Sequence, residues 1–230
     1  MAIRSMVGGV TDKIPVKTVL LSVFDKKGLE TFVPGLVEAC PTGVLFLSTG
    51  GTYNRLRELG IPNLLEVAQY TEFPEMEGGL VKTLHPKIHA GILGERNNPA
   101  HQEYLKSLGN GVYIDMVVVN LYPFDKVISK PGATFEDARG NIDIGGPTMV
   151  RGAAKNFPSC AVVIDPDDYA GTLQHVRDNN GCTTLDHRMS LVPKAFYHTA
   201  AYDRAIAAHM AEHILGSKDV VRAEYEIKGS

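Results

Sequence analysis

The feature that most constrains the fold is a set of short apolar runs that alternate with helical patterns. The runs at 16–23, 44–47 and 114–120 are nearly continuous in apolar residues, which is typical of strands covered on both faces. Between the first two runs, apolar residues recur at the spacing of one helical face, at Leu29, Phe32, Val33, Leu36 and Val37. Strands that alternate with helices in this way predict a parallel sheet in an α/β fold.

The rest of the chain divides around this sheet. Residues 1–15 are mixed in character and predict a flexible arm. Residues 68–94 show little periodicity, and a loop of that length inside a domain is usually functional. We expect the α/β domain at 16–183 and a helical extension at 184–230. Further helices are predicted at 53–59, 99–108 and 169–179, and Asp167 is expected to cap the last of them. Two more helices are expected to start at Thr134 and Pro147, and further strands are predicted at 61–67 and 160–164.

Composition excludes several classes of function. With 230 residues and 44% hydrophobic content the chain can build a packed core. A net charge of -3 with scattered basic residues gives no general attraction to nucleic acid. No run approaches the ~18 apolar residues of a membrane span, so we expect a cytoplasmic protein. Cys40, Cys160 and Cys182 form no C-x-x-C pair and are expected to be reduced thiols rather than disulfides or zinc ligands.

A glycine turn after the second strand is the first chemical signal. Ser48-Thr-Gly-Gly-Thr52 exposes N–H and O–H donors between a strand and a helix start, as a phosphate requires. It is neither a Walker loop nor a G-x-G-x-x-G fingerprint. A plain tight turn is the alternative, and Lys26 after the neighbouring strand favours a monophosphate.

Two histidines in the long loop have the spacing of metal ligands. His85 and His89 are four residues apart, but Pro86 and Lys87 stand where a zinc protease has its glutamate. The sequence offers no third ligand nearby, so we expect structural hydrogen bonds and no metal.

The stretch 141–156 combines a carboxylate with a glycine-rich helix start. Asp143 precedes Gly145, Gly146 and Pro147, and the free N–H groups of such a start suit a developing negative charge. Arg151 and Lys155 follow on one helical face, which an ordinary basic stripe also explains. The helix from Pro147 to Lys155 spans about 12 Å, so Asp143 and Lys155 share a site only if the preceding chain folds back.

Polar groups also end the strand at 114–120. Asn120 and Tyr122 follow its apolar residues, and ligands collect at the carboxyl ends of parallel strands. The alternative for Tyr122 is a packed aromatic ring with a surface hydroxyl.

These motifs together resemble the inosine monophosphate (IMP) cyclohydrolase domain of the bifunctional purine biosynthesis protein family, over residues 16 to about 205. The resemblance implies a methylglyoxal synthase-like fold, three layers α/β/α around a mostly parallel sheet. It also implies dehydrative closure of 5-formamidoimidazole-4-carboxamide ribonucleotide (FAICAR) to IMP without metal or cofactor. The motifs are Ser48–Thr52, Val81–Pro86, Asn120–Phe124, Ile142–Gly146 and Arg151–Asn156.

The resemblance implies roles for particular residues. The substrate phosphate is expected at Ser22, Lys26, Thr49, Gly50, Gly51 and Thr52. The ribose and base are expected at Val81, Lys82, Thr83 and Asn120, with further substrate contacts from Asp25, Asp143, Ile144 and Gly145. The catalytic residues are expected to be Lys82, Tyr122, Asp143 and Lys155.

The implied chemistry divides between substrate and protein. The attacking amide nitrogen and the formyl carbon belong to one molecule. Much of the ~7–11 kcal/mol by which proximity can lower an activation barrier is therefore supplied by the substrate itself. A donor to the developing oxyanion contributes roughly 3–4 kcal/mol, and Lys82, Tyr122 and the N–H groups near Gly145 are candidates. Lys155 is expected to relay a proton while Asp143 orients the carboxamide.

Two positions depart from the family pattern. Leu80 stands where an arginine is usual, and Phe24 where a small hydroxyl residue is common. Both changes remove a polar partner, so we expect weaker substrate binding than in a typical member.

Other functions and partners stay open at this point. A methylglyoxal synthase-like lyase or a nucleotide-binding regulatory module would share the phosphate turn. The expected ligand is a purine ribonucleotide, with neither nucleic acid nor membrane as partner. The chain is a possible homodimer. The formyltransferase activity that accompanies this domain in the family is expected on a separate chain or on a part of the protein outside these 230 residues.

Overall fold

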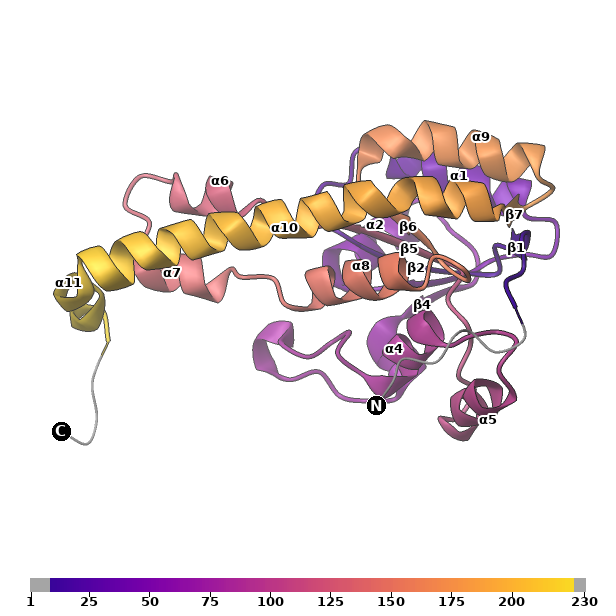
Figure 1. The fold of residues 1–230 in the computed structure, drawn as a ribbon, viewed down its shortest axis with the longest axis horizontal. Coiled ribbons are helices and arrows are strands. Elements are labelled where there is room, and N and C mark those ends of the chain that lie inside the picture. The colour runs from indigo at the N-terminus through magenta and orange to yellow at the C-terminus, as the bar shows by residue number, and fades with distance from the viewer. Residues whose placement is uncertain (1–8, 226–230) are drawn as a thin grey trace.

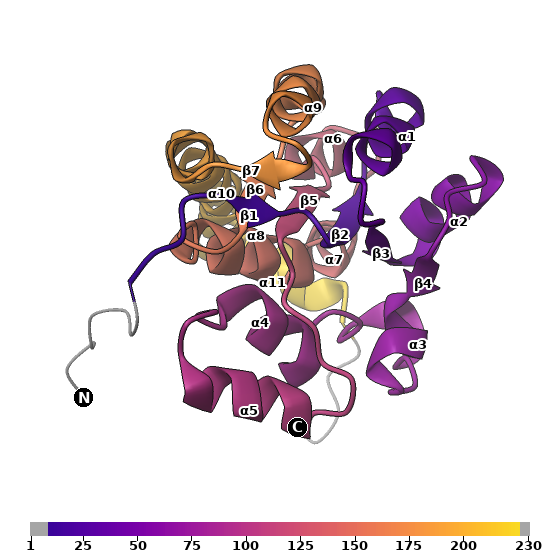
Figure 2. The same ribbon diagram turned by 90° about the vertical axis from the view of Figure 1, so that its right-hand side faces the viewer.

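A five-stranded parallel sheet forms the centre of the computed structural model, which describes residues 9–225 (Figures 1 and 2). The strands follow the order β4-β3-β2-β5-β6 across the sheet. The predicted mostly parallel sheet is therefore confirmed. The strands are β2 (Thr18–Val23), β3 (Leu45–Ser48), β4 (Leu64–Glu66), β5 (Met116–Asn120) and β6 (Ala161–Val163).

The strand order places a topological switch point beside β2. From β2 the chain adds β3 and β4 on one side, and later adds β5 and β6 on the other. The pair β2 and β5 ends with Val23 opposite Asn120. Connections leave these two strand ends in opposite directions, which opens a crevice at the carboxyl edge of the sheet.

Helices cover both faces of the sheet, as the three-layer prediction required (Figure 2). Helices α1 (Leu29–Ala39) and α9 (Tyr169–Asp178) pack together on one face, where the rings of Phe32 and Tyr169 stack with centroids 4.4 Å apart. Helices α4 (Pro86–Leu93), α8 (Gly145–Lys155) and the long α10 (Leu185–Gly216) lie on the other.

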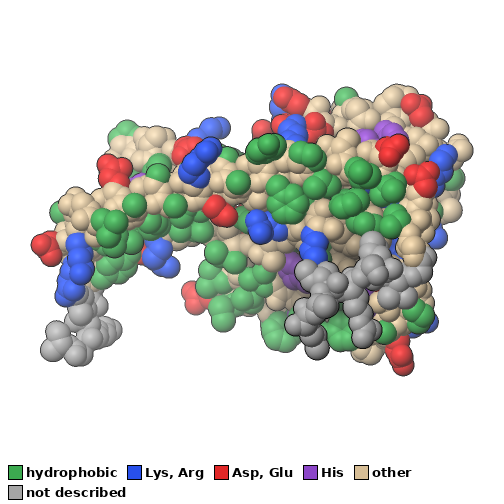
Figure 3. Space-filling view, viewed as in Figure 1, with side chains coloured by type: hydrophobic (Ala, Val, Ile, Leu, Met, Phe, Trp, Pro, Cys, Tyr) green, Lys and Arg blue, Asp and Glu red, His purple; other side chains and the backbone are tan. Residues whose placement is uncertain are grey.

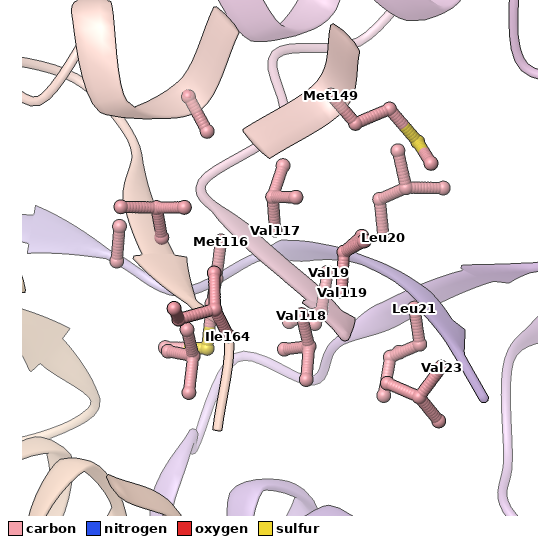
Figure 4. Close-up of a cluster of buried hydrophobic side chains, with 14 of the residues drawn as sticks. Val19, Leu20, Leu21, Val23, Met116, Val117, Val118, Val119, Met149 and Ile164 are labelled. Atoms are coloured by element: carbon pink, nitrogen blue, oxygen red, sulfur yellow. The ribbon is translucent and has the colours of Figure 1, made fainter. Parts of the chain in front are cut away.

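The central strands are apolar throughout because both of their faces are buried. Leu20 and Val117 point toward Met149 of α8, whereas Leu21 and Val118 point to the opposite face (Figure 4). All four strand side chains are fully buried. The remaining elements are α2 (Gly50–Glu58), α3 (Val67–Thr71), η1 (Glu77–Gly79), α5 (Pro99–Ser107), α6 (Phe124–Ile128), α7 (Phe135–Gly140), η2 (Pro166–Asp168), α11 (Lys218–Ala223), β1 (Ile14–Pro15) and β7 (Cys182–Thr183).

Several predicted local features were wrong. The segment 68–94 is not an unstructured loop, because it contains η1, α4 and most of α3. Pro86 begins α4, and the Nδ1 atom of His85 accepts the Lys87 N–H at 3.1 Å. Asp165, rather than Asp167, supplies the cap before α9, since its carboxylate accepts the Asp167 N–H at 2.9 Å.

The structural role predicted for the two histidines is confirmed. His85 caps α4, and His89 hydrogen-bonds to the Thr83 backbone. Within residues 9–225, His, Cys, Asp and Glu side chains form no cluster of three or more that could hold a metal ion.

Part of the predicted N-terminal arm is docked on the domain. Residues 1–8 lie outside the described residues. In the part that is described, Ile14 is buried and pairs with Thr183 of β7 in an antiparallel ribbon. The contact joins the beginning of the described chain to β7, which directly precedes α10. The domain boundaries at 16 and 183 stay a prediction.

The fully buried guanidinium of Arg188 holds this corner together. It donates to the carbonyl oxygens of Thr11, Asp12 and Thr183 at 2.9, 2.9 and 2.6 Å. It also donates to those of Phe157 and Pro158 at 2.8 and 3.1 Å. One side chain of α10 therefore contacts the segment before β1, the last residue of β7 and the turn before β6.

All three cysteines are free thiols. Cys40 and Cys160 are buried, and burial raises the pKa of the Cys40 thiol to about 11 and also raises the pKa of Cys160. Cys182 is partly exposed. Among the described residues, no helix is both long enough and apolar enough to cross a membrane.

Replacement of Arg188 tests the role of this buried cation. We expect Arg188→Lys to lower the free energy of unfolding by about 3 kcal/mol, because an ammonium cannot serve five carbonyl groups in a planar arrangement. Urea denaturation measures the change. Arg177→Lys is the control, because Arg177 is exposed and pairs with Glu38 at 3.4 Å. Equal stability of the two variants would contradict the prediction.

Candidate active site

A pocket of about 340 Å³ lies at the carboxyl edge of the sheet, beside the switch point. It is bounded by the ends of β2 and β3, the residues after β5, the loop that carries η1, and the first residues of α8. The lining residues are Ser22, Thr49, Gly78, Gly79, Leu80, Lys82, Thr83, Tyr122, Gly140, Asn141, Ile142, Asp143, Ile144, Gly145, Gly146 and Met149.

One end of the pocket is suited to a phosphate. The Thr49 side chain forms no cap hydrogen bond at the start of α2, so N–H groups in the first turn of this helix are available to an anion. The hydroxyls of Ser22 and Thr49 hydrogen-bond to each other at 2.9 Å beside this helix start. A Cβ at Gly51 would lie 3.7 Å from the Lys26 ammonium nitrogen, and one at Gly50 would lie 3.8 Å from that of Lys82. Two cations thus flank a helix N-terminus, an arrangement that favours an anion.

Other polar groups of the predicted phosphate site are occupied by structural contacts. The Thr52 hydroxyl donates to the Val23 carbonyl and accepts the Val23 N–H, both at 3.0 Å. The Ser48 hydroxyl donates to the Leu21 carbonyl at 2.9 Å. The Thr52 hydroxyl thus joins the start of α2 to β2, and the Ser48 hydroxyl joins β3 to β2. The phosphate contact expected from Thr52 stays a prediction.

Asn120 is likewise used in the scaffold. Its side-chain oxygen accepts the N–H groups of Phe24 and Asp25 at 2.7 and 2.9 Å, and its amide nitrogen donates to the Asp25 carbonyl at 2.8 Å. Asn120, Asp25 and Lys26 line a neighbouring pocket of about 530 Å³ rather than the main one. The Asn120 amide therefore shapes the turn after β2.

The main pocket also gathers groups with acid and base chemistry. Lys82 and Tyr122 both line it, together with Asp143. The Lys82 ammonium pairs with Glu75 at 2.7 Å, and both side chains are about a third exposed. The ring of Phe24 meets the Tyr122 ring edge to face, with centroids 4.2 Å apart. Three of the four predicted catalytic residues thus share one cavity.

Asp143 is held at the start of α8. Its Oδ1 atom accepts the Gly146 N–H at 2.8 Å. Burial raises the pKa of the Asp143 carboxyl, and the Gly146 N–H opposes that shift. A Cβ at Gly146 would overlap the carboxylate, and a Cβ at Gly145 would overlap the Thr83 hydroxyl. Both glycines are required for the close approach of these groups.

The structure does not bring Lys155 into this pocket. Asp143 lies two residues before the first residue of α8, whereas Lys155 is the exposed last residue of the helix. Ten helical steps separate Gly145 from Lys155, or about 15 Å. The chain before Pro147 does not fold back along the helix, because Asp143 is bonded to the helix start. Lys155 therefore lies outside the pocket that its own chain forms, and its catalytic role stays a prediction.

Val81 also lies outside the main pocket. It lines an adjoining cavity of about 350 Å³ together with Phe73 and Leu84. Leu80, which replaces the usual arginine, does line the main pocket and is 68% exposed. The expectation that Leu80 weakens binding stays a prediction.

Sequence reasoning missed several residues of the site. Gly78 and Gly79 line the pocket with positive φ angles of 76° and 68°, and their adjacency in the long loop was the available signal. Glu75 pairs with Lys82, but in the sequence it looks like any acidic loop residue. Met149 lines the pocket, but in the sequence it looks like an ordinary core residue of a helix. Tyr202 of α10 contacts the Asp143 backbone, and its position in a helical pattern pointed only to packing.

Fold and pocket together define an α/β domain with a polar pocket at the switch point of a parallel sheet. The MGS-like domain family matches residues 31–148, and the chain belongs to that family. The family described as AICARFT/IMPCHase bienzyme matches residues 153–229. The resemblance inferred from the motifs is confirmed at the level of the family.

Individual relatives support the same assignment. The chain is 50% identical over 192 residues to the bifunctional purine biosynthesis protein PurH of Magnetococcus marinus, covering 84% of this chain and 35% of the relative. It is 47% identical over 215 residues to PurH of Chlorobium phaeobacteroides, covering 92% and 40%. The chain thus spans well under half the length of these relatives.

A solved structure is also similar. The structure described as the crystal structure of ForH matches with a TM-score of 0.71 and 33% identity. The match covers 84% of this chain and 97% of that one.

Substitution of Lys26 tests the phosphate end of the pocket. We expect Lys26→Met to weaken binding of inosine 5′-monophosphate about tenfold and to leave inosine binding unchanged, because the phosphate is the only charged group of the ligand that the ammonium can pair with. Calorimetric titration measures both ligands. Lys27→Met is the matched control, since Lys27 is exposed and pairs with Asp167 at 3.5 Å. An equal loss for nucleotide and nucleoside would refute the assignment.

Proposed function

We propose that this chain closes FAICAR to IMP with loss of water, as an IMP cyclohydrolase. The observation that carries the proposal is that the uncapped start of α2, flanked by Lys26 and Lys82, adjoins the pocket that Lys82, Tyr122 and Asp143 line. The names of the PurH relatives and of the bienzyme family support this purine chemistry.

The two ends of the pocket have different tasks in this proposal. The start of α2, Ser22 and Lys26 hold the 5′-phosphate, which places the heterocycle toward α8. There the carboxamide nitrogen attacks the formyl carbon and the formyl oxygen gains negative charge. Lys82, the Tyr122 hydroxyl and the N–H groups at the start of α8 are the donors for that oxygen.

Asp143 acts on the attacking group. Its carboxylate accepts a hydrogen bond from the carboxamide and orients the nitrogen lone pair toward the formyl carbon. A carboxyl whose pKa is raised by burial is also a better proton acceptor than an exposed one. The former formyl oxygen receives one proton from the attacking carboxamide nitrogen and one from the formamide nitrogen. It then leaves as water while a C=N double bond forms between the former formyl carbon and the formamide nitrogen.

A spectrophotometric ring-closure assay tests the proposed function directly. We expect the wild-type chain to convert FAICAR to IMP, and Asp143→Asn to lower kcat by about a hundredfold, because the amide cannot accept the proton. Glu136→Gln, an exposed carboxylate of α7, is the control and should retain kcat. Binding of IMP by a wild-type chain without turnover would instead favour a regulatory nucleotide-binding module.

We further propose that the active form is a homodimer and that Lys155 serves the site of a second copy. Lys155 is exposed and about 15 Å along α8 from its own pocket. Apolar side chains also gather on the loop that carries η1, at the rim of the pocket (Figure 3). These are Phe73, Met76, Leu80, Val81 and Leu84, with exposed fractions from 36% to 68%.

Mixing two inactive variants tests the shared site. If Lys155 acts in a second copy, Asp143→Asn and Lys155→Ala chains mixed as dimers should recover about a quarter of the wild-type sites, because half of the dimers are mixed and carry one intact site each. The ring-closure assay measures the recovery after refolding of the mixture. If Lys155 acts in its own chain, both sites of a mixed dimer stay defective and activity does not return.

The remaining partners belong to the same proposal. A formyltransferase activity would lie outside these 230 residues, on a separate chain or in a longer form of this one. A cytoplasmic location suits an enzyme that consumes a free nucleotide.

A further inference from the structure

Helix α10 contacts the pocket although it follows the α/β domain in the sequence. Its buried residues recur at helical spacing, at Leu191, Ala195, Thr199 and Tyr202. This face packs against α8 and β6. The first half of α10 is thus part of the domain that carries the site, and only its second half projects beyond the sheet (Figure 1).

Tyr202 is the residue of α10 that reaches the reacting end of the pocket. Its hydroxyl oxygen accepts the backbone N–H of Asp143 at 2.7 Å. Its ring is 8% exposed and meets the edge of the Phe124 ring, with centroids 6.4 Å apart. The phenol is therefore fixed by packing, and its oxygen is a fixed acceptor.

Asp143 is consequently held from two sides. The Tyr202 hydroxyl fixes its backbone, and the Gly146 N–H fixes its carboxylate at 2.8 Å. Ile144, the next residue, has φ of -97° and ψ of -46° and is more than half exposed, so little packing holds the chain there. Without the phenol oxygen, the peptide group ahead of α8 would be free to rotate and to move the carboxylate.

We propose that Tyr202 is a positioning residue of the active site, which holds the Asp143 carboxylate in the orientation that ring closure requires. This inference rests on the proposed cyclohydrolase function. It assigns part of the catalytic geometry to α10, a helix that the sequence pattern separates from the α/β domain.

The proposal predicts a separation of kcat from KM. Tyr202→Phe removes only the acceptor oxygen. We expect kcat for FAICAR to fall about tenfold and KM to change less than about twofold, because the phosphate contacts that dominate binding lie at the other end of the pocket. Tyr197→Phe is the matched control, since Tyr197 lies on the same helix and is 77% exposed. Wild-type kcat in Tyr202→Phe would overturn the proposal.

A second measurement separates this inference from the proposed function. Amide hydrogen exchange of the peptide that contains Asp143 should be faster in Tyr202→Phe than in wild type and in Tyr197→Phe, whether or not the chain turns over FAICAR. An inactive wild type with this difference would refute the cyclohydrolase while leaving the tether in place. Unchanged exchange would refute the tether itself. Should Tyr202→Phe fail to fold, fluorotyrosine at position 202 keeps the shape, weakens the acceptor and should give a smaller loss of kcat.

Discussion

The parallel pairing of β2 with β5 is the interaction on which the position of the site depends. These strands are neighbours in the sheet although more than ninety residues separate Val23 from Asn120. Backbone pairing to their last residues brings the two strand ends together, and the Asn120 amide then bonds to Phe24 and Asp25 beyond β2. Because the chain leaves these ends in opposite directions, the edge of the sheet stays open for a ligand.

Two helix starts bring complementary chemistry to this opening. The start of α2 is uncapped within the described chain and lies beside two lysines, so it favours a negatively charged group. The start of α8 instead carries its own carboxylate, since Asp143 accepts the Gly146 N–H. A nucleotide with its phosphate at α2 would therefore place its heterocycle near a base. Under the proposed function, the two helix starts would therefore orient the nucleotide in the pocket.

Sequence reasoning recovered the sheet and most of the pocket because both rest on local patterns. Buried strands are continuous apolar runs, and glycines beside Thr49 and Asp143 indicate close approach to the backbone. What it missed depends on contacts between distant segments. Asn120 and Thr52 look like ligand-binding residues, yet their side chains hold the scaffold. Lys155 was expected to transfer a proton in the site, but it is the last residue of α8 and lies outside the pocket. Tyr202 is 59 residues from Asp143 in the sequence, and the spacing of apolar residues within a helix cannot indicate a contact between such distant positions.

The difference among the three thiols has a practical consequence. Cys40 and Cys160 are buried and retain their protons at neutral pH, whereas Cys182 on β7 is partly open to reagents. A maleimide dye should therefore label the native protein at one position without any engineered cysteine. Cys182 lies three residues before α10, so the dye would report by fluorescence anisotropy on the root of that helix as nucleotides enter and leave.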